Sequence, residues 1–223
     1  GNPDMCGICG ILNRDLAPVD LATLQDMTRT LVHRGPDDEG FLTRPGVGLG
    51  MRRLSVIDVE GGHQPISNED ATVHVVLNGE IYIHADLRCE CEARGHRFTT
   101  RSDTEAIVHL YEEYGDSCVD HLNGMFAFAL FDQRRNRVLI ARDRLGIKPL
   151  YYSERNGRLV FGSEIKALLA SGRIQRSVNW EALHEYLYYG YVLGSNSLFD
   201  GVERLLPGHT LTITQEEVRD RVY

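Results

Sequence analysis

The amino-acid sequence predicts an α+β fold of mostly antiparallel sheets with helices packed outside them. Apolar segments of strand length come mostly in pairs joined by short polar stretches, as residues 126–131 and 138–141 do around residues 132–136. Strands that alternated singly with helices would instead predict a doubly wound parallel sheet. The chain has 223 residues, of which 42% are hydrophobic, so it can bury a sizeable core in one large or two small domains.

The spacing of apolar residues predicts each element in order along the chain. Residues 6–13 alternate small and apolar residues, as a buried strand does. Asp20 is expected to cap a helix that continues to about Val32 and ends before Pro36. Further strands are predicted at residues 47–51, 73–77, 126–131, 138–141, 151–152, 159–161 and 209–214, the last being the final strand. Further helices are predicted at residues 85–94, 103–114, 118–122, 165–170 and 180–188.

Charge and hydropathy exclude several classes of partner. The 32 acidic and 24 basic side chains give a net charge of -8, which argues against a general nucleic-acid binder. No apolar run approaches the roughly 20 residues that span a bilayer, and the first residues do not resemble a signal peptide. Five cysteines, an odd number, indicate reduced thiols and a cytoplasmic protein.

The cysteines also raise the question of a metal site. Cys6 and Cys9 form one close pair, and Cys89 and Cys91 form another. Structural zinc usually takes two such pairs set in turns, whereas the first pair lies in a predicted strand and the second in a predicted helix. We therefore expect no metal in this domain.

Cys6 has a special chemical option if it is the first residue of the mature chain. Residues 1–4 are expected to be a remnant of recombinant expression, and Met5 the natural start that is removed in the cell. The α-amine of a terminal cysteine has a pKa near roughly 7.7–8.0, so part of it is free base at neutral pH. It could then accept the thiol proton. The alternative is a small buried thiol in the first strand, which is the commoner environment of cysteine.

A series of motifs stands in a fixed order along the chain. They are residues 6–10 (CGICG), 33–37 (HRGPD), 53–58 (RLSVID), 78–82 (NGEIY), 102–105 (SDTE), 124–128 (GMFAF) and 142–151 (RDRLGIKPLY). Together they closely resemble the glutaminase domain of glutamine-dependent asparagine synthetases. That domain is a class II glutamine amidotransferase and an N-terminal nucleophile hydrolase. The resemblance covers residues 6–214 and implies a four-layer αββα sandwich that hydrolyses L-glutamine to glutamate and ammonia.

By this resemblance, Cys6 is the nucleophile, and Asn78 with Gly79 forms the oxyanion hole. The other interpretation of Asn78-Gly79 is a tight hairpin turn, for which this pair is the strongest short signal. One departure adjoins the motif, because family members commonly have asparagine where this chain has Ile83.

The resemblance also assigns the groups that bind substrate. Arg53 would bind the α-carboxylate of glutamine and Asp103 its α-ammonium, while Arg52 would point away. The alternative for Asp103 is a helix N-cap, shared with Ser102. The motif at residues 33–37 would shape the pocket wall, and the one at 142–151 would organise a loop and contact a second domain. The remaining expected pocket groups are Leu54, Ser55, Val56, Ile57 and Glu80.

A second, synthetase domain is implied but has no counterpart here. Its Ser-Gly-Gly-x-Asp-Ser pyrophosphate loop does not occur in the sequence. ATP and magnesium are therefore expected only in that domain, and no cofactor in this one. Residues 215–223, which show no partner in the chain, are expected to begin a linker to it. A homodimer, an amidotransferase with another acyl-adenylate acceptor, and a catalytically silent module stay open as alternatives.

Overall fold

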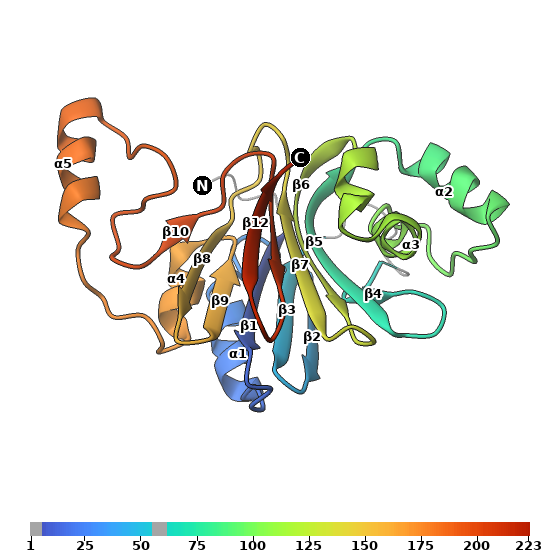
Figure 1. Cartoon of the computed structure of the whole chain (residues 1–223), viewed down its shortest axis with the longest axis horizontal. Helices are drawn as coiled ribbons and strands as arrows, with labels where there is room; N and C mark the ends of the chain where they lie inside the picture. The colour runs from blue at the N-terminus through green and yellow to red at the C-terminus, as the bar shows by residue number, and fades with distance from the viewer. Residues whose placement is uncertain (1–5, 55–61) are drawn as a thin grey trace.

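Two six-stranded antiparallel sheets form the centre of the computed structural model, which describes residues 6–54 and 62–223 (Figure 1). The first sheet has the order β10-β8-β9-β1-β3-β2 and the second the order β12-β11-β7-β6-β5-β4. The strands of the first sheet are β1 (Gly7–Asn13), β2 (Asp38–Arg44), β3 (Val47–Arg53), β8 (Tyr151–Arg155), β9 (Arg158–Gly162) and β10 (Glu203–Arg204). Those of the second are β4 (Ile66–Ser67), β5 (Val73–Ile81), β6 (Gly124–Asp132), β7 (Arg137–Arg142), β11 (His209–Ile213) and β12 (Val218–Val222).

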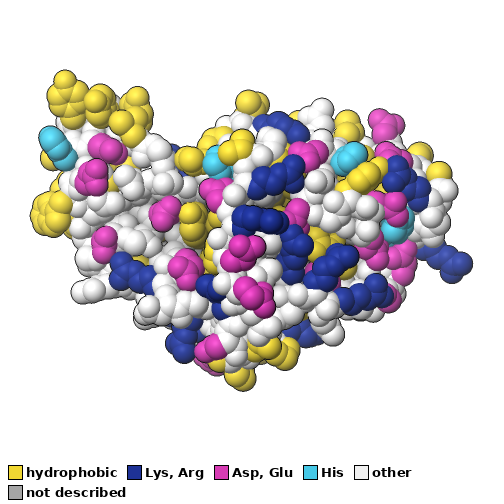
Figure 2. Space-filling model, in the orientation of Figure 1, with side chains coloured by type: hydrophobic (Ala, Val, Ile, Leu, Met, Phe, Trp, Pro, Cys, Tyr) yellow, Lys and Arg dark blue, Asp and Glu magenta, His cyan; other side chains and the backbone are white. Residues whose placement is uncertain are grey.

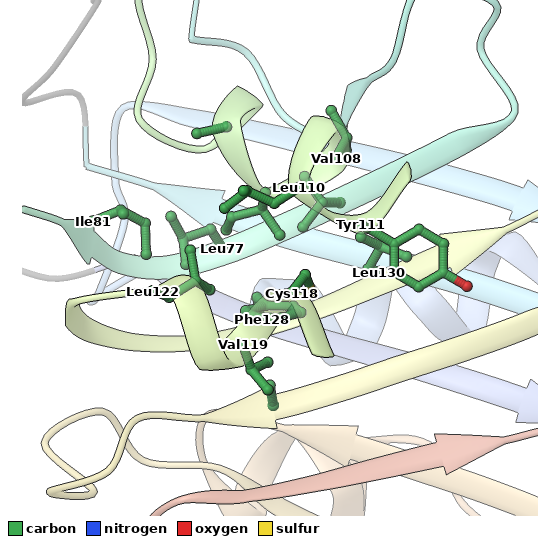
Figure 3. Close-up of a cluster of buried hydrophobic side chains, with 14 of the residues drawn as sticks. Leu77, Ile81, Val108, Leu110, Tyr111, Cys118, Val119, Leu122, Phe128 and Leu130 are labelled. Atoms are coloured by element: carbon green, nitrogen blue, oxygen red, sulfur yellow. The ribbon is translucent and has the colours of Figure 1, made fainter. Parts of the chain in front are cut away.

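Helices cover the outer face of each sheet, which confirms the predicted αββα arrangement. The first sheet packs against α1 (Leu21–Arg29) and α4 (Ile165–Ala170), with which it shares one apolar cluster. The second packs against α2 (His84–Ala93), α3 (Glu105–Tyr114) and the 3₁₀ helix η1 (Gly115–His121). Figure 3 shows side chains of α3 and η1 beside those of β5 and β6. A further apolar cluster lies between the two sheets. Helix α5 (Trp180–Tyr189) stands to one side (Figure 1).

Strand β6 shows why the central strands have continuous apolar sequences. Successive side chains of a strand point to opposite faces, and both faces of β6 are buried. Phe126, Phe128 and Leu130 contact the helices, whereas Ala127 and Ala129 contact the opposite sheet. A strand that is buried on both faces needs no polar residue at alternate positions.

The structure corrects the prediction at the C-terminal end of the chain. Residues 209–214 do not form the final strand, because β12 follows and pairs with β11 from His209↔Val222 to Ile213↔Val218. The expectation that residues 215–223 lack a partner in the chain is therefore wrong. Strand β2, which pairs with β3, was also not predicted.

The predicted helix start at Asp20 is confirmed, since its side chain accepts hydrogen bonds from the backbone N–H groups of Ala22 and Thr23. The predicted strands at residues 151–152 and 159–161 lie in β8 and β9, which pair with each other. Within the described part of the chain, every helix is too short or too polar to cross a bilayer.

Candidate active site

Strand ends and one helix start bring the predicted site residues into a single pocket. Cys6 lies at the head of β1, Arg53 ends β3, Asn78 and Gly79 lie in β5, and Asp103 precedes α3. The same pocket is lined by Leu54, Gln64, Leu77, Glu80, Ser102, Thr104, Met125 and Lys148. The predicted residues Ser55, Val56 and Ile57 lie outside the described residues.

Backbone and side-chain contacts hold Cys6 in place. The backbone N–H of Leu54 lies 3.4 Å from the Cys6 Sγ, and the guanidinium of Arg34 donates a 2.9 Å hydrogen bond to the Cys6 carbonyl oxygen. Arg34 is itself buried and pairs with Glu164 at 3.1 Å. The sequence motif that contains Arg34 suggested a pocket wall, but nothing in the sequence indicated Glu164.

Glu164 supplies the negative charge that holds Arg34 in position. Burial by itself would raise the pKa of Glu164, but hydrogen bonds from His33, Lys166 and Arg34 lower it to about 2. The carboxylate therefore stays charged throughout the neutral range and keeps Arg34 directed at the backbone of Cys6.

The surroundings of the Cys6 thiol act on its acidity in opposite directions. Burial raises the pKa of the Cys6 thiol and Asp103 adds to this, whereas the Leu54 N–H, Arg53 and Lys148 lower it. The net effect is a pKa above the ordinary value, so the thiol is protonated at neutral pH. A nucleophilic Cys6 therefore needs a base that accepts its proton.

Lys148 is a pocket residue that the prediction placed in a motif for loop structure and for contact with a second domain. Its side chain is buried and lines the pocket beside Cys6. The loop is built around the Asp143 carboxylate, which accepts hydrogen bonds from the backbone N–H groups of Leu145, Ile147 and Lys148 at 2.9–3.1 Å. The expected loop-organising role thus falls to Asp143.

Replacing Lys148 with methionine should make Cys6 harder to ionise. The positive charge of Lys148 lowers the pKa of the Cys6 thiol, so its removal leaves burial less opposed and raises that pKa further. Alkylation of Cys6 by iodoacetamide, followed by mass spectrometry across a pH series, should show a midpoint at higher pH in Lys148→Met. Arg134→Met, which removes an exposed charge outside the pocket, is the control. An unchanged midpoint in Lys148→Met would contradict the electrostatic assignment.

Asn78 and Gly79 do not form a hairpin turn. Both lie within β5 and pair with β6, Asn78 with Ala127 and Gly79 with Phe126. Gly79 is needed there because a Cβ atom would lie 2.1 Å from the Met125 carbonyl oxygen. The turn interpretation, although favoured by local statistics, is therefore wrong.

The side-chain amide of Asn78 is a buried polar group with no hydrogen-bond partner among the described residues. Neither its nitrogen nor its oxygen has a hydrogen bond among the described residues, and the residue is 0% exposed. Leaving such a group unsatisfied costs on the order of 1–3 kcal/mol. Because Asn78 lines the pocket, a bound molecule could supply the missing partner.

Asp103 is tied to β5 and does not cap α3. One of its carboxylate oxygens accepts a 2.8 Å hydrogen bond from the backbone N–H of Ile81. The N-cap of α3 is Thr104, which makes no side-chain capping hydrogen bond. The N-cap alternative for Asp103 is therefore wrong, and its buried carboxylate lines the pocket.

The two neighbouring arginines at the end of β3 have different environments. Arg53 lines the pocket. Arg52 donates to the carbonyl oxygen of Gly35 at 2.8 Å and pairs with Glu39 at 2.7 Å. This alternation of an extended strand is the one expected from the sequence.

The other cysteines do not form a cluster with Cys6. Cys9 contacts the helices on the outer face of β1, with its Sγ 3.2 Å from the Thr28 hydroxyl, whereas Cys6 packs toward the opposite sheet. Cys89 is exposed and Cys91 buried, and all the cysteines are free thiols. Neither close pair is therefore arranged as a zinc knuckle.

An αββα sandwich of two antiparallel sheets, with a cysteine at the head of a central strand, is the architecture of the N-terminal nucleophile hydrolase fold. The chain belongs to the family described as the glutamine amidotransferase domain, which it matches over residues 5–223.

Individual relatives agree with this membership. Asparagine synthetase [glutamine-hydrolyzing] 3 of Bacillus subtilis is 42% identical over 95% of this chain, which covers 35% of that protein. Amidase chyE of Penicillium rubens is 41% identical over 80% of this chain and 26% of its own length. This chain thus spans about a third or less of these curated relatives. The fold also matches that of glutamine phosphoribosylpyrophosphate amidotransferase from B. subtilis, with a TM-score of 0.69, 18% identity, and coverage of 97% of this chain and 49% of that one.

Proposed function

We propose that this domain hydrolyses L-glutamine to glutamate and ammonia with Cys6 as the nucleophile. The observation that carries the proposal is the unsatisfied, buried amide of Asn78 in the same pocket as the Cys6 thiol. An amide held without a partner in a folded protein is a donor that is ready for an oxyanion. Membership of the glutamine amidotransferase family supports the choice of substrate.

The proposed reaction proceeds through a thioester. In a chain from which the residues before Cys6 have been removed, the α-amine of Cys6 takes the thiol proton. Sγ then attacks the side-chain carboxamide carbon of glutamine. The resulting oxyanion accepts hydrogen bonds from the Asn78 amide and the Gly79 backbone N–H. As the intermediate collapses, the ammonium of Cys6 donates its proton to the departing NH2 group, so that the C–N bond breaks and ammonia is released. Water then hydrolyses the γ-glutamyl thioester to glutamate and restores the thiol.

Labelling tests this proposal directly. A glutamine analogue with an electrophilic side chain should modify Cys6 alone, and glutamine should protect it. Mass spectrometry of the peptides would locate the label, and a glutamate assay would identify the product. A domain that binds glutamine yet neither becomes labelled at Cys6 nor forms glutamate would be a silent module.

Arg53 and Asp103 are proposed to select a free amino acid by pairing with its two charges. Arg53→Met should raise the KM for glutamine roughly 10–100-fold, since a hydrogen bond to a charged group contributes about 1.5–3 kcal/mol. Arg52→Met is the matched control, because Arg52 bonds to Gly35 and Glu39. Steady-state kinetics measure both. Equal KM values for Arg53→Met and the unmodified domain would show that Arg53 does not contribute to glutamine binding.

The wider role that we propose is to supply ammonia to a synthetase domain on the same polypeptide, for asparagine synthesis from aspartate and ATP. The names of the Bacillus relatives support this acceptor. ATP and magnesium would belong to that second domain. Two fungal relatives are named as amidases, and the alternative is therefore that the ammonia goes to a different acceptor. The free thiols of all five cysteines support a reducing, cytoplasmic location.

Helix α5 is proposed as the docking surface for that synthetase domain. Figure 2 shows hydrophobic side chains gathered over this helix, where Trp180, Leu187 and Tyr188 are 75%, 75% and 77% exposed. Exposed apolar patches of this kind mark interaction sites. A second copy of the chain is the competing occupant.

Leu187→Glu should therefore leave glutamine hydrolysis by this domain unchanged. In a polypeptide that carries both domains, it should lower glutamine-dependent synthesis while synthesis from added ammonia persists. Leu21→Glu, on the distant helix α1, serves as the control. Unimpaired glutamine-dependent synthesis in Leu187→Glu would exclude α5 as the docking surface, and a dimer lost on this substitution would assign the helix to self-association.

A further inference from the structure

A cluster of histidines and glutamates lies outside the pocket, beside α3. His109 and Glu112 are three positions apart on α3, and therefore lie on one face of the helix. His96 follows α2, and Glu69 lies between β4 and β5. One donor atom from each of these residues falls within 4.8 Å of all the others. The fold thus gathers four metal-ligating side chains from segments that are far apart in the sequence.

The separations between the donor atoms match a tetrahedral metal site. The Nδ1 atom of His96 lies 3.7 Å from Glu69 and 3.5 Å from Glu112. The Nδ1 atom of His109 lies 3.7 Å from Glu69 and 3.4 Å from Glu112. Zinc bonds of 2.0–2.2 Å place tetrahedral ligands about 3.3–3.6 Å apart. These four nitrogen–oxygen separations of 3.4–3.7 Å are thus close to the edge lengths of a zinc tetrahedron.

In both histidines the Nδ1 atom faces the cluster. A glutamate from outside the cluster lies near the Nε2 atom of each. The Nε2 atom of His96 lies 3.0 Å from Glu113, and that of His109 lies 3.8 Å from Glu105. Zinc-binding histidines almost always have such an outer partner, which orients the ring.

The two glutamates are also held from outside. Glu69 accepts a 2.8 Å hydrogen bond from the backbone N–H of Arg97, and Glu112 accepts one of 2.7 Å from the side-chain amide of Asn68. His96 and both glutamates thus have a hydrogen-bonded neighbour outside the cluster, as ligands of a preorganised metal site do, whereas His109 is held by packing against Phe98.

The charge of the cluster fits a divalent cation, and the burial of its members ranges from the exposed Glu69 and Glu112 to the buried His109. His109 is 0% exposed and packs against the ring of Phe98, with ring centroids 4.4 Å apart. Two neutral imidazoles and two carboxylates would together balance the charge of one Zn²⁺. Four protein ligands leave no open position, which is typical of a structural rather than a catalytic zinc site.

We propose that Glu69, His96, His109 and Glu112 bind one structural zinc ion, which ties the β4–β5 connection, the end of α2 and helix α3 together. The sequence shows no sign of this site, because its ligands match no zinc-binding spacing. The inference is independent of the proposed glutaminase activity, since none of the four residues lines the pocket.

Zinc titration against a competing chromophoric chelator tests the site. The chain should be purified without a metal-affinity step and studied in a Cys6→Ala, Cys89→Ser background, because Cys6 and Cys89 are the cysteines with accessible thiols. We expect one zinc ion per chain, at least about 100-fold weaker binding in His96→Gln, and roughly 10–100-fold weaker binding in the outer-partner variant Glu113→Gln. His184→Gln, on α5, should bind zinc as the unmodified background does.

Two further measurements keep the test independent of folding defects in the variants. Zinc, but not magnesium, should raise the Tm of the background chain, and X-ray absorption should show nitrogen and oxygen neighbours without sulfur. Absence of stoichiometric zinc binding, binding that His96→Gln does not weaken, or sulfur among the ligands would each overturn the proposal. The cluster would then be an ion-pair network around histidine.

Discussion

A chain that begins at Cys6 should release ammonia from glutamine at least about 100-fold faster than the same chain with one residue added before Cys6, because positioned proton transfer contributes about 10²–10⁴-fold. The raised pKa of the Cys6 thiol leaves it protonated at neutral pH. Only a free α-amine travels with that thiol as a base, and an added residue converts this amine into an amide that cannot accept a proton.

The comparison needs two controls. Cys6→Ala on the shorter chain should release no ammonia above background while still binding glutamine by calorimetry, which establishes the zero level. Thermal unfolding should be alike in all forms, so that a lost rate is not a lost fold. Equal rates with and without the added residue would refute the α-amine as the base.

Asn78→Ala should lower kcat for glutamine hydrolysis by about 10²–10³, because one oxyanion-hole donor contributes about 2.7–4 kcal/mol to transition-state stabilisation. KM should change little, since the oxyanion exists only after attack. Asn78 has no hydrogen-bond partner among the described residues, so no other contact is lost with its amide.

Steady-state kinetics with glutamine measure this effect, and the exposed Asn123→Ala supplies the matched control. A full kcat in Asn78→Ala would show that the oxyanion is stabilised elsewhere. A rise in KM without a fall in kcat would make Asn78 a substrate-binding residue only.

The sequence could predict those site residues that belong to local motifs. Cys6 directly precedes β1, Arg53 ends β3 and Asn78 lies within β5, so a strand places each of them. Gln64 and Lys148 reach the same pocket from connecting segments. Their placement depends on how the two sheets stack, which no local pattern expresses.

The same limit explains the missed strands. Strand β12 has no fully buried side chain, so it lacks the apolar alternation that identifies a strand in a sequence. It is held by backbone pairing with β11, which depends on the neighbouring strand and not on its own composition. The turn interpretation of Asn78-Gly79 is wrong for the opposite reason. The local preference of this pair for a turn is strong, but continuous pairing of β5 with β6 overrides it.

The hydrogen bond from Arg34 to the Cys6 carbonyl oxygen has a thermodynamic consequence. The first residues of a chain ordinarily fray, yet the hydrogen bond from Arg34 and the ion pair of Arg34 with Glu164 hold Cys6 against the first sheet. The entropy of ordering the nucleophile is thus lost when the domain folds, not when substrate arrives. Binding energy from glutamine can then serve the chemical step.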